Sequence, residues 1–315
     1  MSGKYQRVGS GVFAVDTEYV RPRMDASYLI LDHGRAAFVD TGTYHSVPNL
    51  LETLASQGLE ARHVDYILLT HIHLDHAGGA GRLSQSLPGA KVLVHPRGAA
   101  HLIDPSKLIS ATKAVYGEAT FVEHYHDLVP IPGERIVAAQ DGFEFTLGRR
   151  AFKVIHTPGH ALHHLCIHDL AAGEVFCGDT FGVSYRELDN ASGAFIFPTT
   201  SPSQFDPAQL HASVDRIRRL KPAALYLTHY GRVSGIDALA EQLHADIDAF
   251  VAIARSVAGL PDRVASMAPQ LFDHLAKRLD AGGGNGSAHT WHRLLDGDVM
   301  LNATGLDAWL ARLAG

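Results

Sequence analysis

Short apolar runs, each stopped by turn residues, recur along the first 230 residues and predict β-strands. The predicted strands cover residues 11–19, 26–32, 36–42, 65–70, 91–96, 135–140, 143–148, 151–157, 163–169, 174–180 and 223–229. Helical spacing of apolar positions predicts helices at 47–59, 76–87 and 206–221, the last beginning with an Asp-Pro pair. Strands and helices share this part of the chain, which favours one α/β (α+β) domain.

Two segments do not follow this pattern of short strands and intervening helices. Residues 97–130 predict one or two helices followed by a proline-punctuated loop, and a long insertion between strands is more often functional than idle. After residue 235 the pattern is helical only, with predicted helices at 236–257, 263–279 and 299–315. The apolar faces of this helical extension, residues 236–315, need a partner surface. The extension therefore either caps the main domain or forms a homodimer contact.

Composition narrows the classes of partner. The net charge of −6 leaves no cationic surface for a phosphate backbone, so we expect no nucleic acid. No apolar run approaches the roughly eighteen residues of a membrane helix, so we expect no membrane. The first residues lack a charged-then-apolar signal region, which predicts a cytoplasmic protein. Cys166 and Cys177 lie in apolar strand-like runs and are predicted to be buried hydrophobes rather than ligands.

The strongest chemical signal is a cluster of histidine and aspartate directly after the predicted strand 65–70. His71, His73, Asp75 and His76 fall within six residues. Successive residues of a strand face opposite sides, so His71 and His73 can share one face. Asp75 and His76 then lie on the turn into the next helix. Such a loop can supply two neighbouring metal positions, and its imidazole and carboxylate donors suit zinc, iron or manganese.

Six residues cannot complete two coordination spheres, so further ligands must come from elsewhere. His160, Asp179 and His229 each follow a strand-like run. Loops at strand ends are where sites are assembled in α/β proteins. Each residue alone could be structural, but their joint occurrence with the upstream cluster favours a metal site.

The motifs THIHLDH, HTPGH, GDT and LTH, in this order, resemble those of the metallo-β-lactamase fold superfamily over about residues 10–235. The resemblance implies a four-layer αββα sandwich, with two sheets face to face and helices outside, as the catalytic domain of residues 1–235. It also implies two metal ions: His71, His73 and His160 on the first, Asp75, His76 and His229 on the second, and Asp179 bridging both. Asp40, in VDTG, matches the aspartate that orients a ligand histidine. A carboxylate that caps its own turn is the alternative role for Asp40.

The residues that the chain has and lacks disfavour some branches of this superfamily. The resembling β-lactamases lack the bridging aspartate, and the lactonases that act on acyl-homoserine lactones carry a tyrosine where this chain has Gly182. The remaining branch, similar to glyoxalase II, lactonases and small esterases, implies hydrolysis of an ester, thioester or lactone in a small-molecule substrate. Two divalent ions, zinc first, would supply a metal-bound hydroxide, and Asp75 would carry the proton to the leaving group.

Three residues are candidate substrate contacts. Tyr185 and Tyr230 follow two of the motifs, and His124 lies in the insertion. A packed loop tyrosine and a solvated histidine are the alternatives. Two other functions stay open. One is iron-dependent sulfur dioxygenation with a single iron, and the other is a signalling protein of the same fold whose hydrolysis is incidental.

Overall fold

The computed structural model describes residues 4–191, 193–200, 204–284 and 286–314, which form two compact units. The first unit contains the described residues up to His156 together with His163–Gly178 and Ala223–Arg232. The second contains Thr157–Leu162, Asp179–Pro222 and the described residues from Val233 onward. The two units do not correspond to the predicted domains 1–235 and 236–315, because the second unit also contains segments before residue 235. The domain assignment therefore stays a prediction.

The first unit contains a sheet whose seven strands are ordered as in the chain. Its strands are β1 (Tyr5–Gly9), β2 (Val12–Asp16), β3 (Ala26–Asp32), β4 (Arg35–Val39), β5 (Val64–Leu68), β6 (Lys91–Val94) and β7 (Ile136–Ala138). Strands β1 to β4 pair antiparallel, whereas β4 to β7 pair parallel. Parallel neighbours require crossover connections, which here contain helices. The ends of β4 and β5 consequently meet at one edge of the sheet.

The crossover helices follow β4, β5 and β6 in turn. They are α1 (Val47–Ser56), α2 (Leu74–Ala77), α3 (Ala80–Ser86), α4 (Pro96–Ile103), α5 (Ser106–Tyr116) and α6 (Glu118–Tyr125). Where the sequence predicts one or two helices at 97–130, the structure contains three. The count was too low because Gly117, with φ of +85°, turns the chain between α5 and α6.

The second sheet has the order β13-β12-β11-β10-β9-β8. Its strands are β8 (Glu144–Leu147), β9 (Arg150–His156), β10 (Leu165–Asp169), β11 (Glu174–Gly178), β12 (Ala224–Leu227) and β13 (Gly231–Val233). Strands β8 to β11 pair antiparallel, and β12 joins β11 in parallel. The sheet therefore mixes both strand directions, as the first one does.

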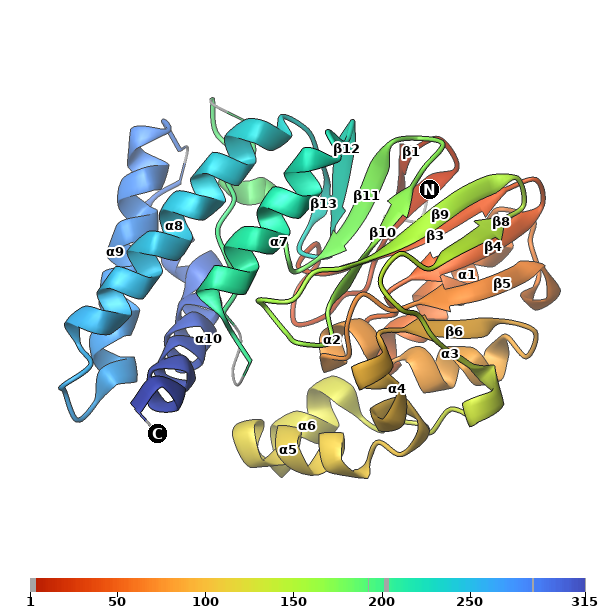
Figure 1. The fold of residues 1–315 in the computed structure, drawn as a ribbon, viewed down its shortest axis with the longest axis horizontal. Coiled ribbons are helices and arrows are strands. Elements are labelled where there is room, and N and C mark those ends of the chain that lie inside the picture. Colours follow the sequence, from red (N-terminus) through yellow and green to blue (C-terminus); the bar gives the residue numbers. More distant parts are fainter. Residues whose placement is uncertain (1–3, 192, 201–203, 285, 315) are drawn as a thin grey trace. The chain divides into compact units, whose positions relative to one another are not determined.

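Alternate residues of the strands build two apolar cores. Tyr28 of β3 packs toward Phe176 and Tyr226 of the second sheet, with ring centroids 5.4 Å and 5.3 Å away. The next residue, Leu29, belongs to the other core, where the first sheet meets α1 and α3. This alternation places the two sheets face to face with helices outside the first (Figure 1). The cysteine prediction is confirmed, because Cys166 and Cys177 are fully buried in β10 and β11.

The second unit is mostly helical. Its helices are α7 (Pro207–Arg219), α8 (Ile236–Ser256), α9 (Arg263–Ala281) and α10 (Ala288–Ala314). α8 packs against the other three, and α9 packs against α10. α10 begins at Ala288 rather than at the predicted residue 299, because the buried Trp291, Leu294 and Leu295 extend its apolar face. Within the described part of the chain, no helix combines the length and hydropathy needed to cross a membrane.

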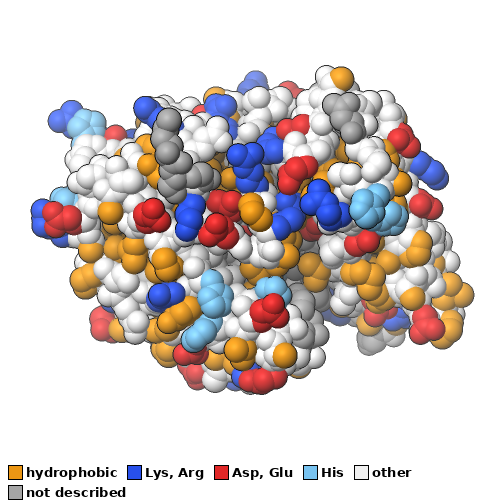
Figure 2. All heavy atoms as spheres, turned by 180° about the vertical axis from the view of Figure 1, so that it is seen from behind, with side chains coloured by type: hydrophobic (Ala, Val, Ile, Leu, Met, Phe, Trp, Pro, Cys, Tyr) orange, Lys and Arg blue, Asp and Glu red, His pale blue; other side chains and the backbone are white. Residues whose placement is uncertain are grey.

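Acidic and basic side chains are interspersed on the face of the molecule shown in Figure 2 rather than gathered by sign.

Candidate metal centre

The ligand loop follows β5 directly. His71 Nε2 lies 2.9 Å from His73 Nδ1, so alternate residues of the loop turn their ring nitrogens toward each other. α2 begins at Leu74, which places Asp75 and His76 in its single turn. Two of the potential ligands, His71 and His73, therefore precede this helix, and the other two, Asp75 and His76, belong to it.

A third strand end brings His229 to the same place. His229 lies two residues beyond the end of β12, and the ligand atoms of Asp75, His76 and His229 all lie within 4.8 Å of one another. The Nε2 atoms of His76 and His229 are 3.7 Å and 3.4 Å from the same oxygen, Asp75 Oδ2. His76 is fully buried and His229 nearly so. Two adjacent residues of the ligand loop and a histidine that is distant in sequence thus form one donor group.

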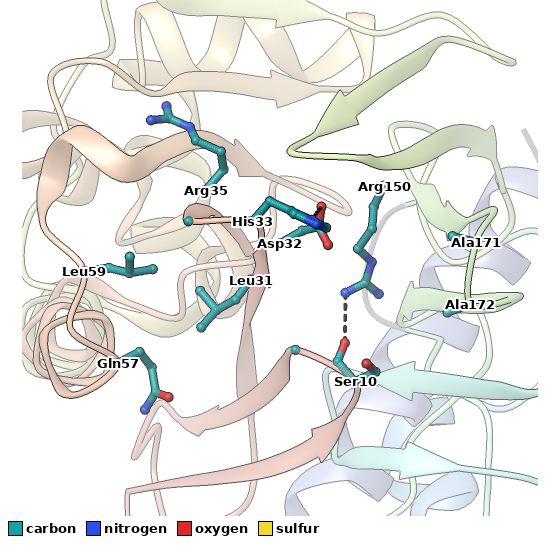
Figure 3. A pocket seen from close by; sticks show the side chains of 12 residues that line it. Ser10, Leu31, Asp32, His33, Arg35, Gln57, Leu59, Arg150, Ala171 and Ala172 are labelled. Carbon is teal, nitrogen blue, oxygen red and sulfur yellow. Dashed lines mark hydrogen bonds and ion pairs between the residues drawn. The ribbon is translucent and has the colours of Figure 1, made fainter.

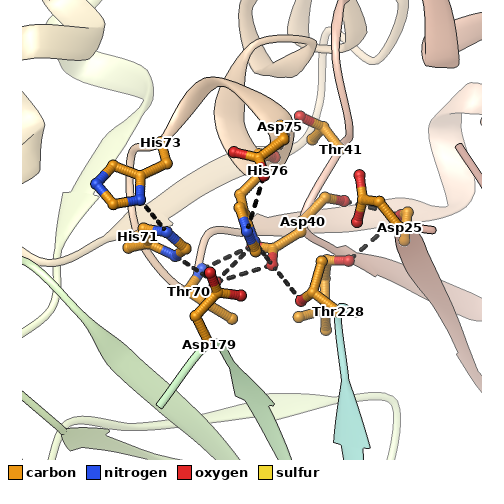
Figure 4. A network of polar contacts seen from close by, with 12 residues as sticks. Asp25, Asp40, Thr41, Thr70, His71, His73, Asp75, His76, Asp179 and Thr228 are labelled. Atoms are coloured by element: carbon orange, nitrogen blue, oxygen red, sulfur yellow. Dashed lines mark hydrogen bonds and ion pairs between the residues drawn. The ribbon is translucent and has the colours of Figure 1, made fainter. Parts of the chain in front are cut away.

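Asp40 connects the ends of three strands (Figure 4). It follows β4, is fully buried, and accepts hydrogen bonds from the backbone N–H of Thr70 at 2.8 Å and from Thr228 Oγ1 at 2.9 Å. His76 Nδ1 donates to Asp40 Oδ2 at 2.8 Å. These bonds reach residues beyond β5, on α2 and beyond β12, so the carboxylate contacts other segments rather than capping its own turn.

The hydrogen bonds made by Nδ1 of His76 and of His229 determine the direction in which Nε2 of each ring points. His76 Nδ1 meets a carboxylate, and His229 Nδ1 meets the carbonyl oxygen of Met24 at 2.9 Å. Because both partners are acceptors, both Nδ1 atoms carry the proton. Each Nε2 therefore presents a lone pair toward Asp75. This is the arrangement in which an imidazole binds a cation.

The second unit contains a matching pair. His160 Nδ1 donates to the carbonyl oxygen of Thr199 at 3.1 Å, and His160 Nε2 lies 3.4 Å from Asp179 Oδ2. Both side chains are almost fully buried. Along the chain, Asp179 directly follows β11 and His160 lies four residues after β9. The ring of His160 thus has the same orientation as those of His76 and His229, with Nδ1 on a protein oxygen and Nε2 toward a carboxylate.

Several residues near the loop were missed from the sequence. The ring of His164 is fully buried and stacks on His71 with centroids 4.9 Å apart, and His163 lies edge-on to His73 at 5.6 Å. The doubled histidine in HALHHLC was the available signal. Gly178, with φ of +49°, approaches so closely that an added Cβ would lie 2.6 Å from His164 Nε2.

Asp25 is a further missed residue. It is fully buried, and its Oδ2 accepts a hydrogen bond from Thr17 Oγ1 at 2.9 Å. Burial raises the pKa of Asp25 to about 7, although the neighbouring His229 and His76 lower it. No periodicity or motif marked this residue, because it stands as a single polar position before an apolar strand.

The three candidate substrate contacts lie in different surroundings. His124, on α6, is half-buried and packs edge-on against Tyr19 with ring centroids 6.0 Å apart. Tyr230 is half-buried and packs against the core between the sheets. Tyr185 is 1% exposed, and its hydroxyl donates to Asp298 Oδ2 at 3.0 Å.

A hollow of about 720 Å³ lies at the turn between β3 and β4, where Arg35 and Arg150 line it (Figure 3). It lies at the opposite end of β4 from Asp40, about 17 Å along a five-residue strand. Arg35 is paired with Asp65 and Arg150 with Asp169, so neither charge is available to an anion. Among the described residues that line the hollow, no group of potential metal ligands comparable to the histidine loop occurs.

Comparisons with known proteins identify the family of this chain. The sequence pattern of the metallo-beta-lactamase superfamily matches residues 20–229. The chain is 29% identical over 219 residues to the metallo-beta-lactamase fold-containing protein ST1585 of Sulfurisphaera tokodaii, covering 68% of this chain and 75% of that protein. The crystal structure of ST1585 superposes with a TM-score of 0.64 at 23% identity, covering 95% of this chain and 98% of that one.

Two named enzymes are also similar. The hydroxyacylglutathione hydrolase of Aeromonas hydrophila is 29% identical, covering 66% of this chain and 62% of that protein. The acyl-coenzyme A thioesterase MBLAC2 of Gallus gallus is 26% identical, covering 56% of this chain and 64% of that protein. The chain thus spans less than two thirds of the length of either enzyme.

The chain belongs to the metallo-beta-lactamase superfamily. The predicted resemblance and fold class are confirmed: two mixed sheets are flanked by helices and followed by a C-terminal helical segment. The superfamily consists mostly of hydrolases, and the chain carries a cluster of histidine and aspartate that could bind metal.

Proposed function

We propose that this protein is a dinuclear metal-dependent hydrolase that acts on the carbonyl of an ester, thioester or lactone. The orientation of His76, His229 and His160 carries the proposal. Each ring has Nδ1 bonded to a protein oxygen and Nε2 turned toward a carboxylate. The two named relatives, a hydroxyacylglutathione hydrolase and an acyl-coenzyme A thioesterase, make thioesters the first substrates to test.

The donor set fits two divalent ions. We assign His71, His73 and His160 to the first ion, Asp75, His76 and His229 to the second, and Asp179 to both. The donors are imidazole and carboxylate, which suit zinc and also accept iron or manganese. A bound ion of this kind lowers the pKa of a water ligand toward neutrality and polarises a carbonyl oxygen.

Among the aspartates, Asp75 is placed best to move a proton. Its side chain is 23% exposed, whereas those of Asp40 and Asp179 are 1% and 6% exposed. A proton held on Asp75 can therefore exchange with solvent or with a leaving group. Asp40 acts differently: it keeps the proton of His76 on Nδ1 and so directs Nε2 inward.

The insertion packs beside the ligand loop, which supports a role in substrate binding. Leu74, between His73 and Asp75, packs against Phe121 and Tyr125 of the insertion. We propose that His124 and Tyr230 contact the substrate. Tyr185 is the weakest of the three proposed contacts, because its hydroxyl is bound to Asp298. A homodimer through the helical extension and a cytoplasmic location stay proposals too.

A substrate panel of thioesters, esters, lactones and phosphodiesters, combined with elemental analysis, tests the function. We expect two metal equivalents per chain, loss of activity on chelation and recovery on adding metal. In heavy-oxygen water the label should enter the product acid in the first turnover. One iron equivalent with oxygen uptake on a persulfide would instead support the dioxygenase, and an acyl-enzyme would contradict direct attack by water.

A further inference from the structure

The loop that follows β11 in the second unit starts at one proposed metal ligand and supports another. Asp179 is its first residue, and further along the loop the carbonyl oxygen of Thr199 accepts the Nδ1 proton of His160 at 3.1 Å. With the proton held on Nδ1, Nε2 of His160 presents its lone pair toward Asp179. The place of the Thr199 carbonyl therefore decides how His160 presents its ligand atom.

The next residue of the loop, Thr200, is bound to α10. Its backbone N–H donates to Asn302 Oδ1 at 2.7 Å. Its hydroxyl lies 2.9 Å from the carbonyl oxygen of Asn302 and 3.0 Å from Oδ1. Both residues are buried. Because a buried N–H without a partner is costly, these bonds fix the backbone of the loop directly beside Thr199.

A second contact joins the same loop to the same face of α10. The hydroxyl of Tyr185 donates to Asp298 Oδ2 at 3.0 Å. Asp298 stands four residues before Asn302, so the two side chains lie on one face of the helix. Between these two points, Arg278 of α9 donates to the carbonyl oxygen of Ile196 at 3.1 Å. The C-terminal helices thus hold the loop at three places within the second unit.

The residue type at position 302 is explained by this contact and not by the helix. Asparagine is a poor helix former, and its amide is costly to bury without hydrogen bonds. Its neighbours on the buried side of α10 are apolar: Val299, Ala303 and Leu306. A leucine at 302 would suit both the helix and these neighbours. The asparagine therefore serves the loop, to which it offers the acceptor that Thr200 requires.

We propose that Asn302 is a positioning residue for His160. By holding Thr200, it keeps the carbonyl oxygen of Thr199 where it binds the Nδ1 proton of His160, and so leaves Nε2 available to a metal ion. This inference rests on the proposed function, which assigns His160 to the first ion. It gives the helical extension a part in metal binding within a single chain, beyond the predicted roles of cap or dimer contact.

The test compares zinc retention by full-length variants after dialysis against graded chelator, with urea unfolding measured alongside. Asn302→Leu removes the acceptor of Thr200, whereas Asn302→Asp keeps an oxygen in the same place. Loss of a group that orients a ligand histidine costs about 10-fold or more in metal affinity. We expect Asn302→Leu to release one ion at about 10-fold lower chelator than the wild type, and Asn302→Asp to retain it.

Two further variants separate positioning from stability. Leu306→Ala removes apolar packing from the same helix and no hydrogen bond of the loop, so it should lower the urea midpoint and leave zinc retention near that of the wild type. Thr200→Val keeps the shape of the side chain and the backbone bond but removes the hydroxyl contact. It should weaken zinc retention less than Asn302→Leu does, and it replaces that variant if Asn302→Leu does not fold.

A second readout needs no metal. In the metal-free chain, nitrogen-15 NMR shows which ring nitrogen of His160 carries the proton, and His160→Gln assigns the signal. We expect the proton on Nδ1 in the wild type and a mixture of the two tautomers in Asn302→Leu.

Equal zinc retention and equal tautomers in Asn302→Leu and the wild type would overturn the proposal. Loss of zinc from Leu306→Ala to the same extent as from Asn302→Leu would overturn it too, because the effect would then be one of stability. A chain whose zinc retention and tautomer depend on residue 302, but which hydrolyses none of the substrate panel, would support this inference and contradict the proposed function. Hydrolysis with two ions that does not depend on residue 302 would do the reverse.

Discussion

Replacing Asp40 by asparagine is the sharpest perturbation of the candidate centre, because it keeps the shape of the side chain and changes one atom from acceptor to donor. Asp40 Oδ2 accepts from His76 Nδ1 and from the hydroxyls of Thr228 and Thr70, while Oδ1 accepts from the backbone N–H of Thr70. In Asp40→Asn, the amide oxygen keeps the bond to Thr70. The amide nitrogen then faces His76 Nδ1 and the two threonine hydroxyls.

The imidazole and the hydroxyls respond differently. The hydroxyls of Thr228 and Thr70 can rotate and accept from the new amide. His76 can accept only if its proton moves from Nδ1 to Nε2, which removes the lone pair directed at Asp75. Loss of such an orienting carboxylate costs about 10- to 100-fold in metal affinity, or about 1.4–2.8 kcal/mol. The chain should stay folded, because the contacts with Thr70 and Thr228 survive.

The measurement is metal content after dialysis against graded chelator, with circular dichroism as the check on folding. Thr228→Val is the matched control, since it removes one hydrogen bond from the same carboxylate and leaves the proton of His76 in place. We expect Asp40→Asn to lose metal at lower chelator than the wild type and Thr228→Val to stay near the wild type. Equal retention of metal by Asp40→Asn and the wild type would refute the reasoning.

Three further predictions concern separate features. Asp179→Ala should lower turnover by orders of magnitude and more than His229→Ala does, because Asp179 is assigned to both ions; equal loss in the two variants would contradict bridging. Gly178→Ala should destabilise the fold by about 1–3 kcal/mol more than Gly173→Ala in urea unfolding, because both have positive φ but only the Cβ at 178 meets other atoms. Burial lowers the pKa of His95 from 6.5 to about 4, so its contribution to stability is complete above pH 6.5 and is lost as the pH falls from 6.5 toward 4. Between pH 7 and pH 5 the wild type should lose about 2 kcal/mol more unfolding free energy than His95→Asn, whose side chain can still cap α4. Identical pH dependence in both proteins would count against this account.

The sequence predicted the candidate ligands because their signal is local. His71 to His76 occupy six consecutive positions, and a strand followed by a turn explains how they share a site. The long strands were predictable for the same reason, since their apolar residues alternate with polar ones or form a continuous run, which is a local pattern. Two strands, β1 and β13, were not predicted. Both are short, and β1 is largely exposed, so neither contains an apolar run of the expected length.

Other features depend on contacts between distant segments, which periodicity cannot reveal. The start of α10 was placed too late because its first three turns contain polar residues around Trp291, and burial of that side chain extends the helix. His164 looked like an ordinary strand residue, yet it stacks on His71, which lies 93 positions earlier in the chain. The contact between Thr200 and Asn302 was overlooked because the two residues stand 102 positions apart, and only packing joins them.

The contacts of Asp40 show why the fold and the site cannot be separated in this protein. The parallel pairing of β4 and β5 places Asp40 beside Thr70, and the end of β12 adds Thr228 from the opposite sheet. The same carboxylate orients His76. A polar group that is fully buried requires partners, so the stability of the strand ends and the direction of a proposed ligand depend on one side chain. Substitutions that loosen these strand ends should therefore weaken metal binding before they unfold the chain, even where they touch no ligand.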